Sequence, residues 1–153
     1  MTSIANLNPD VALAALLDGK VSVQTSKKKS HTIKVYADEE RPNKGVGDEF
    51  IDVEWNGGAS SQTIPLGLFR GNIALVIWCK AQTDGRAKKK LVRQIIAQCD
   101  KLVNNKVSDG FYFEFDPMNV ITPTTVNLTS GYSTTVLNVS WRVTNDFINK
   151  LNK

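Results

Sequence analysis

The single histidine is the first place where this sequence could do chemistry. His31 could serve in a Ser/His/Asp site, which needs only one imidazole held in place by the fold. It lies in a polar segment beside Lys29 and Ser30, however, and no G-x-S-x-G elbow or comparable local context accompanies it. We therefore interpret His31 as an ordinary surface histidine.

The carboxylates and the two cysteines give no stronger case for catalysis or metal binding. Carboxylates that could pair for acid–base work cluster in a loop with Gly and Pro, where water prevents the desolvation that tunes such groups. Cys79 and Cys99 each lie in an apolar segment, so we expect them to be buried and reduced, and no ligand spacing suggests a metal. We predict that the protein is not an enzyme and has no catalytic residues, metal site or cofactor.

Signatures of phosphate binding are weak in this sequence. Gly45-Val46-Gly47 is followed by acidic residues and opens no helix, and neither a Walker nor a Rossmann fingerprint is present. A basic helix face later in the chain could contact phosphate groups, although it lacks interleaved aromatic residues and a helix-turn-helix partner. A basic accessory protein that binds nucleic acid is therefore kept as an alternative function.

Charge is distributed unevenly along the 153 residues, whose formal net charge is +4. Residues 1–76 carry a net charge of −1 and residues 77–153 one of +5. Acidic residues concentrate in 38–54 and basic residues in 86–106, which indicates either two solvated surfaces or two complementary contact patches. The candidate subunit-interface residues are Asp38, Glu39, Glu40, Glu49, Arg86, Lys88, Lys89, Lys90 and Arg93.

Length and composition are typical of one globular domain spanning residues 1–153, large enough to bury a core without disulfides or metal. Hydrophobic residues make up 41% and charged residues 22%, both ordinary values. No apolar run approaches the roughly 20 residues of a membrane span, so we expect no membrane insertion. The apolar segment 11–17 is short and lacks a basic lead-in, so we do not expect a signal peptide.

The N-terminal half predicts a short helix followed by strands. Asn8, Pro9 and Gly19 are suited to cap, begin and end a helix over about residues 8–18, which is apolar enough to dock on its own sheet or on a neighbouring subunit. Alternating apolar residues predict strands within residues 20–80, at 21–23, 33–35, 50–55 and 68–80. Exposed connections are predicted at 27–30, 38–47 and 60–67, the first two of them flexible in the isolated subunit and protected on assembly.

Residues 68–80 form the most strand-like segment and are apolar on both faces, which predicts a central strand covered twice. One face carries Ile73, Leu75, Ile77 and Cys79, and the other carries Ala74, Val76 and Trp78. A long amphipathic helix over about 86–104 follows, with an apolar stripe and a basic outer face. We predict that the first strand face packs on this stripe, and that the second is covered by another layer or subunit. The predicted core contacts join Ile73, Leu75 and Ile77 to Leu91, Ile95, Cys99 and Leu102.

The C-terminal half predicts strands over 110–144 and a short tail over 145–153. Three phenylalanines alternate on one face after Gly110, and a final strand over 132–144 turns its alternate apolar residues inward. Inward residues of that strand are Leu137, Val139, Trp141 and Val143, whereas Thr134, Asn138, Ser140 and Arg142 face the other way. The predicted fold class is α+β: a mostly antiparallel sheet with the long amphipathic helix packed on one face and a short N-terminal helix.

Three segments together resemble a known group of proteins. These are the strand Gly67-Leu68-Phe69-Arg70-Gly71-Asn72-Ile73-Ala74-Leu75-Val76-Ile77-Trp78-Cys79-Lys80 with the basic helix after it, then Gly110-Phe111-Tyr112-Phe113-Glu114-Phe115-Asp116-Pro117, and then Gly131-Tyr132-Ser133-Thr134-Thr135-Val136-Leu137-Asn138-Val139-Ser140-Trp141-Arg142. The order of elements over roughly residues 5–144 is similar to that of the small neck and tail proteins of tailed bacteriophages, in particular the tail terminator (tail completion) proteins.

This resemblance implies a structural virion protein rather than an enzyme. Such proteins form a ring, commonly a hexamer, at the head-proximal end of the tail, where they terminate tube polymerisation and join the tail to the head connector. The implied partners are copies of the chain, the tail tube protein and the head-side connector or stopper protein, with DNA only passing through the ring lumen. The implied location is the tail or neck of the virion, after assembly in the host cytoplasm. A different neck or head-completion protein is the alternative within this class.

Overall fold

The computed structural model describes residues 8–24, 30–37, 47–55, 60–62, 68–80, 85–118, 120–121 and 132–144. Of the residues 60–62, 68, 85–88 and 120–121 it describes the backbone only. Our predictions for 27–29, 38–46 and the tail over 145–153 lie outside the described residues.

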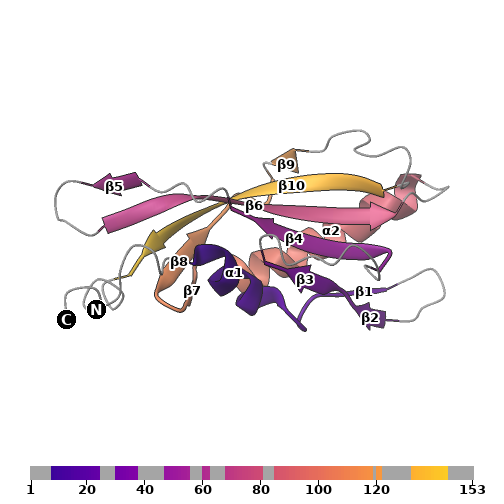
Figure 1. The fold of residues 1–153 in the computed structure, drawn as a ribbon. Helices are drawn as coiled ribbons and strands as arrows, with labels where there is room; N and C mark the ends of the chain where they lie inside the picture. Colours follow the sequence, from indigo (N-terminus) through magenta and orange to yellow (C-terminus); the bar gives the residue numbers. More distant parts are fainter. Residues whose placement is uncertain are drawn as a thin grey trace.

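Twelve elements follow one another in the described part of the chain (Figure 1). They are α1 (Pro9–Leu17), β1 (Ser22–Gln24), β2 (Ser30–Thr32), β3 (Lys34–Tyr36), β4 (Glu49–Glu54), β5 (Ser60–Gln62), β6 (Leu68–Lys80), α2 (Gly85–Val103), β7 (Lys106–Ser108), β8 (Phe111–Glu114), β9 (Val120–Ile121) and β10 (Tyr132–Val143). The main sheet has the order β3-β4-β6-β10-β8-β7, with β5 paired to β6 and β9 to β10, and β1 pairs with β2 separately. The predicted α+β class is confirmed at this level.

The long strands β6 and β10 form the centre of the sheet. They pair antiparallel from Tyr132 opposite Lys80 to Arg142 opposite Arg70. Because side chains alternate along a strand, this register gives both strands one common apolar face, as their sequences predict. The buried residues of that face are Ile73, Leu75, Ile77 and Cys79 from β6, with Leu137, Val139, Trp141 and Val143 from β10.

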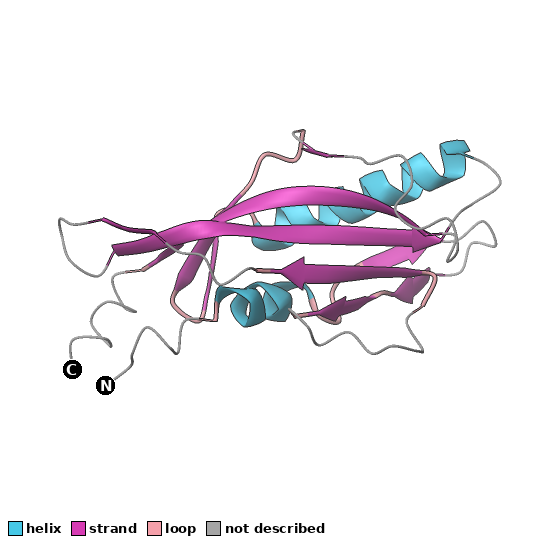
Figure 2. Ribbon diagram, turned by 45° about the horizontal axis from the view of Figure 1, so that its top comes forward, coloured by secondary structure: helices cyan, strands magenta, loops and turns pink. Residues whose placement is uncertain are grey.

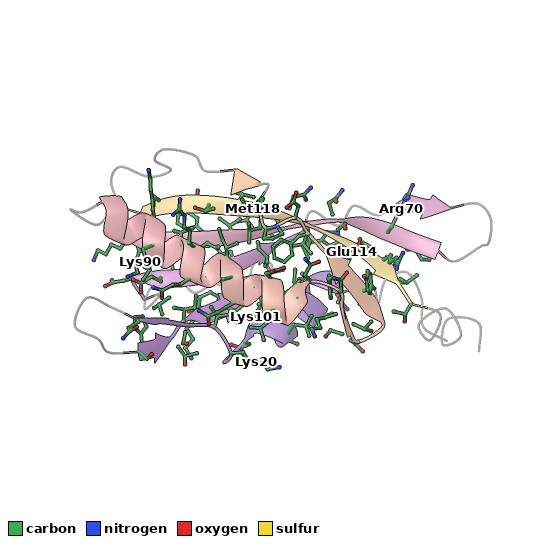
Figure 3. The ribbon with its side chains drawn as sticks, turned by 180° about the vertical axis from the view of Figure 1, so that it is seen from behind. Lys20, Arg70, Lys90, Lys101, Glu114 and Met118 are labelled. Carbon is green, nitrogen blue, oxygen red and sulfur yellow. The ribbon has the colours of Figure 1, made fainter. Side chains whose placement is uncertain are left out.

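Both helices contribute to the core on this apolar face. Figure 2 shows α2 running along one side of the long strands, and the view from behind in Figure 3 shows it in front of them. Ile95 and Cys99 of α2 are fully buried in the same cluster as Leu75, and Leu102 is partly buried against it. The structure therefore places the predicted partners of β6 in one core.

The short helix α1 docks on the sheet of its own chain. It contacts β3 and β4 at one side of the sheet and β7 and β8 at the other, so the sheet curls around it. Leu13 and Leu17 are fully buried, whereas Val11 is 49% exposed. Asn8 takes the N-cap position without the side-chain cap bond that its type favours, and Gly19 ends the turn at φ +74°.

Three features differ from the sequence-based expectations. β3 and β4 pair parallel, because the connection over 37–48 is long enough for the crossover that a parallel pair requires. β5 lies inside the predicted connection 60–67 and pairs with the start of β6, although its polar residues show no apolar alternation. β7 is a three-residue edge strand that the sequence did not indicate.

Candidate interaction surface

The face of the sheet opposite α1 and α2 is its open face, since none of the described helices covers it. Phe50 and Val76 are buried on this face and stand outside the core that the helices close. The cross-strand register sets Phe50 of β4 directly opposite Trp78 of β6. The sequence predicted that this side of β6 is apolar and is covered by another layer or subunit. The apolar residues are present, but no helix in the described part of the chain covers them.

An aromatic cluster (Tyr36, Phe50, Trp78 and Tyr132) occupies one end of the open face. Phe50 is at its centre: its ring stacks on Trp78 at 5.6 Å between centroids and 11° between planes. Tyr132 and Tyr36 meet Phe50 edge-on at 5.7 Å and 6.1 Å. Phe50 is therefore 2% exposed while the three rings around it are partly exposed.

Strand register and one hydrogen bond hold these rings together. Tyr132 begins β10 opposite Lys80, diagonal to Trp78, which is within reach for aromatic side chains on one sheet face. The Tyr132 hydroxyl donates to the carbonyl oxygen of Gly47 at 2.9 Å and so ties the start of β10 to the start of β4. Tyr36, Phe50 and Tyr132 were not among our candidate residues, because only the pairing of distant strands brings them together.

Glu49 is not the solvated loop carboxylate that its neighbours suggested. It begins β4 opposite Cys79, on the side of the sheet that faces the core, and it is 7% exposed. Its Oε2 lies 3.1 Å from Nε2 of His31, whose side chain is 45% exposed. The prediction that His31 lies at the surface holds, but Glu49 is enclosed by its own chain and is poorly placed to contact another subunit.

The basic candidates lie on α2. Lys89, Lys90 and Arg93 are exposed, and so is Lys101, about two turns after Arg93. Figure 3 labels Lys90 and Lys101 on the helix. Arg86 and Lys88 belong to the same helix, although their side chains lie outside the described part. Asp38, Glu39 and Glu40 lie outside the described residues, so the two charged patches are not brought together within the described chain.

The cysteines are free and buried, as predicted. Burial raises the pKa of the Cys99 thiol from its ordinary value of 9.0 to about 12, which keeps it protonated and unreactive near neutral pH. Within the described residues no group of three or more His, Cys, Asp or Glu side chains is arranged to hold a metal ion.

No family model matches the chain, and no curated protein is significantly similar to it. In the part of the chain that the structure describes, neither helix is long and apolar enough to cross a lipid bilayer.

Proposed function

We propose that this protein is a structural subunit of a tailed-phage virion, and that it assembles with copies of itself into a ring, commonly a hexamer. The ring would sit at the head-proximal end of the tail, end tube polymerisation there and dock to the head-side connector or stopper protein. DNA would pass through its lumen, and assembly would take place in the host cytoplasm. The proposal combines the sequence resemblance with one structural observation, the aromatic cluster on the open face.

The aromatic cluster supports this proposal through its composition and through the long paired strands on which it lies. Partly exposed Trp and Tyr side chains are enriched at protein–protein interfaces, and Trp and Tyr are over-represented among the few residues that contribute most of the binding energy. Trp78 and Tyr132 stand on β6 and β10, the two longest strands, which pair along most of their length. A surface on such a rigid platform loses little conformational entropy on binding.

A ring requires two different surfaces on each subunit, one for each neighbour. The open face carries the aromatic cluster on one side of the sheet, and the exposed residues Lys89, Lys90 and Arg93 of α2 lie on the helix that packs against the other side. These two surfaces differ in chemistry and in direction. This arrangement favours head-to-tail association over a symmetric dimer.

Native mass spectrometry of the purified chain, together with negative-stain images, tests the proposal. We expect a closed oligomer with a central opening, of one defined stoichiometry. A chain that stays monomeric or dimeric at high concentration in low and in physiological salt would contradict the ring. Reconstitution with the tail tube protein distinguishes a terminator from another neck protein, because only a terminator should stop tube growth.

The exposed lysines of α2 favour one second candidate, an accessory protein that binds nucleic acid. Lys89, Lys90 and Arg93 could contact successive phosphates. In that case retention on duplex DNA should weaken steeply as salt rises, with a slope set by the number of phosphate contacts. A shallow slope that is unaffected by Lys90→Glu would count against this candidate.

A further inference from the structure

A hollow of about 380 Å³ opens on the sheet where β6 and β10 lie beside the end of β8 and the turn after α2. Its lining is mostly polar, and the polar side chains that matter for its chemistry are Asn72, Asn105, Glu114, Asp116, Asn138 and Ser140. Figure 3 labels Glu114, which lies on β8 at this hollow. At the usual rise of a strand, Asn72 lies about 20 Å along β6 from Trp78, so the hollow is separate from the aromatic cluster.

Three polar side chains form a row across the open face at this point. Ser140 of β10 is the direct cross-strand partner of Asn72 on β6 and of Glu114 on β8, and all three are exposed. Because neighbouring strands lie about 4.8 Å apart, the row spans about 10 Å. Asn138 is two residues before Ser140 on the same face and is also exposed, so it extends the polar surface along β10. A ligand in the hollow would meet hydrogen-bonding groups from three strands.

Hydrogen bonds within the chain hold one side of the hollow in place. The Tyr112 hydroxyl lies 2.8 Å from Oε1 of Glu114 and 2.7 Å from Oδ1 of Asn105. The Ser140 hydroxyl donates to the carbonyl oxygen of Glu114 at 3.1 Å. Side chains that are fixed before a ligand arrives lose less conformational entropy on binding.

The amides of Asn72 and Asn138 differ from that of Asn104, which also lines the hollow. Asn104 Nδ2 donates to Oδ1 of Asp100 at 3.0 Å, and Asn104 Oδ1 accepts from the backbone amide of Phe115 at 3.2 Å. That amide ties the end of α2 to the end of β8. Within the described part of the chain, no hydrogen bond or ion pair engages the side chains of Asn72 and Asn138. Each of them therefore offers one acceptor and two N–H donors to a ligand.

We infer that this hollow binds one sugar unit of a neutral carbohydrate. A side-chain amide both donates and accepts hydrogen bonds, as each hydroxyl of a sugar does, and the carboxylates of Glu114 and Asp116 accept from hydroxyls. Sites for small molecules measure roughly 300–1,000 Å³ and are usually lined by apolar side chains. A polar hollow in this size range suits a ligand that is polar over most of its surface.

The lining disfavours anions and metal ions. Among the described residues that line the hollow none is a lysine or an arginine, and Glu114 and Asp116 repel an anion such as a phosphate group. These two carboxylates attract cations, but the described residues contain no group of three or more His, Cys, Asp or Glu side chains arranged to hold a metal ion. The inference goes beyond the proposed function, because it applies to the chain in any state of assembly.

Saturation-transfer difference NMR with the full chain tests the inference. The probes are the methyl glycosides of glucose, galactose and mannose, each measured alone. We expect saturation transfer to the ring protons of at least one of them, with affinity in the millimolar range that is usual for a small ligand with few anchoring contacts. Tetraethylene glycol is neutral and of similar size but has no pair of neighbouring hydroxyls, so it should give no signal.

Substitutions of the two amides locate the binding. Asn72→Ala and Asn138→Ala should each weaken binding about tenfold, as the loss of one or two neutral hydrogen bonds does. Gln24→Ala removes an exposed amide from β1, in the separate two-stranded sheet, and should leave the affinity unchanged. Asn138→Asp keeps the shape of the side chain but replaces its N–H donors by a charge, so it should also weaken sugar binding. Circular dichroism compares the fold of each variant with that of the parent.

Three results would overturn the inference. The first is a parent chain that transfers no saturation to any of the three glycosides. The second is equal affinity of the Asn138→Ala and Gln24→Ala chains, because the sugar would then bind elsewhere. The third is calorimetric binding of calcium chloride that is lost in Asn138→Ala and strengthened in Asn138→Asp, because the hollow would then be a cation site. Saturation transfer is observed on the sugar and works for a monomer and for a ring alike, so the two proposals fail separately.

Discussion

Gln98 of α2 binds both backbone groups of Ser22 in β1. The Ser22 amide donates to Gln98 Oε1 at 2.8 Å, and Gln98 Nε2 donates to the carbonyl oxygen of Ser22 at 2.6 Å. The side-chain amide thus takes the place of a neighbouring strand on the edge of β1 that faces away from β2. It fastens the small β1–β2 sheet to the helix that packs on the main sheet.

Gln98→Ala should lower the free energy of unfolding by about 1 kcal/mol, because two exposed hydrogen bonds are lost and water replaces them in part. Chemical denaturation measures this loss. Gln94→Ala is the matched control, since Gln94 is one turn earlier and contacts Gln98 only through its backbone carbonyl. Equal stability of the two variants would show that the contact does not fasten the sheet.

Leu75 and Ile95 are fully buried in the core between β6 and α2. Leu75→Ala and Ile95→Ala should each lower the free energy of unfolding by about 2–5 kcal/mol, as core truncations do. Val107→Ala, at a position that is 58% exposed, should change it by less than about 0.5 kcal/mol. Thermal or denaturant unfolding that shows near-zero loss for both core variants would contradict this packing.

The buried Cys99 makes stability depend on pH in the alkaline range. Its pKa is about 12 in the folded chain, and the ordinary value of 9.0 applies when it is unfolded. Above pH 9 the unfolded chain therefore loses the thiol proton while the folded chain keeps it, so the free energy of unfolding falls by up to about 1.4 kcal/mol per pH unit. Below pH 9 this contribution is fully present.

Cys99→Ala should remove this part of the loss of stability at alkaline pH. The difference in the free energy of unfolding between the parent and the variant at each pH isolates the effect of Cys99 from that of other titrating groups. Denaturant unfolding at pH values from about 7 to about 11 gives the two curves. This range extends to both sides of the ordinary thiol pKa of 9.0 and stays below the folded value of about 12. Parallel curves for the two chains would show that Cys99 is not shielded from water.

Local sequence patterns predicted the elements whose signal lies within one segment. The apolar stripe with Leu91 and Ile95 indicated a helix over 86–104, and α2 spans Gly85–Val103. The alternation in β6 and β10 predicted which side chains face the core. These patterns are reliable because burial of one face imposes the period of the helix or strand.

These local patterns do not show which distant segments pair with one another. A one-residue change in strand register exchanges the two faces of a strand, so nothing in the segment around Glu49 shows that it turns toward the core. The same register of β4 on β6 sets Phe50 opposite Trp78. The aromatic cluster therefore emerged only with the fold.

We predict that the acidic segment of one subunit approaches the basic face of α2 of the next subunit, and charge reversal on α2 tests this contact. Lys88, Lys89 and Lys90 changed together to Glu should weaken association, mainly by slowing encounter, because each exposed pair contributes only about 0–1 kcal/mol. Changing Asp38, Glu39 and Glu40 to Lys in the same chain should restore it. Glu49 is left intact because its reversal would place a lysine against His31 in a buried position. Sedimentation velocity at low salt gives the readout.

Full association of the triple lysine variant at low salt would show that the basic residues of α2 are only a solvated surface. A variant that is weakened but not rescued by the acidic reversals would assign the partner of α2 to a different segment. In that case the contact between the two patches is wrong, although the ring itself is not.

Formation of the proposed ring requires the aromatic cluster of the open face to be buried between copies of the chain. Trp78→Glu places a charge in this cluster and should prevent that contact. Met118→Glu is the control, because Met118 is 87% exposed and lies outside the cluster. By sedimentation equilibrium we expect the parent and the Met118 variant to assemble alike, and the Trp78 variant to remain monomeric with the circular dichroism of the parent. Tyr36→Glu, at the rim of the cluster, should act in the same direction. Assembly of the Trp78 and Tyr36 variants to the same size and strength as the parent would contradict the claim.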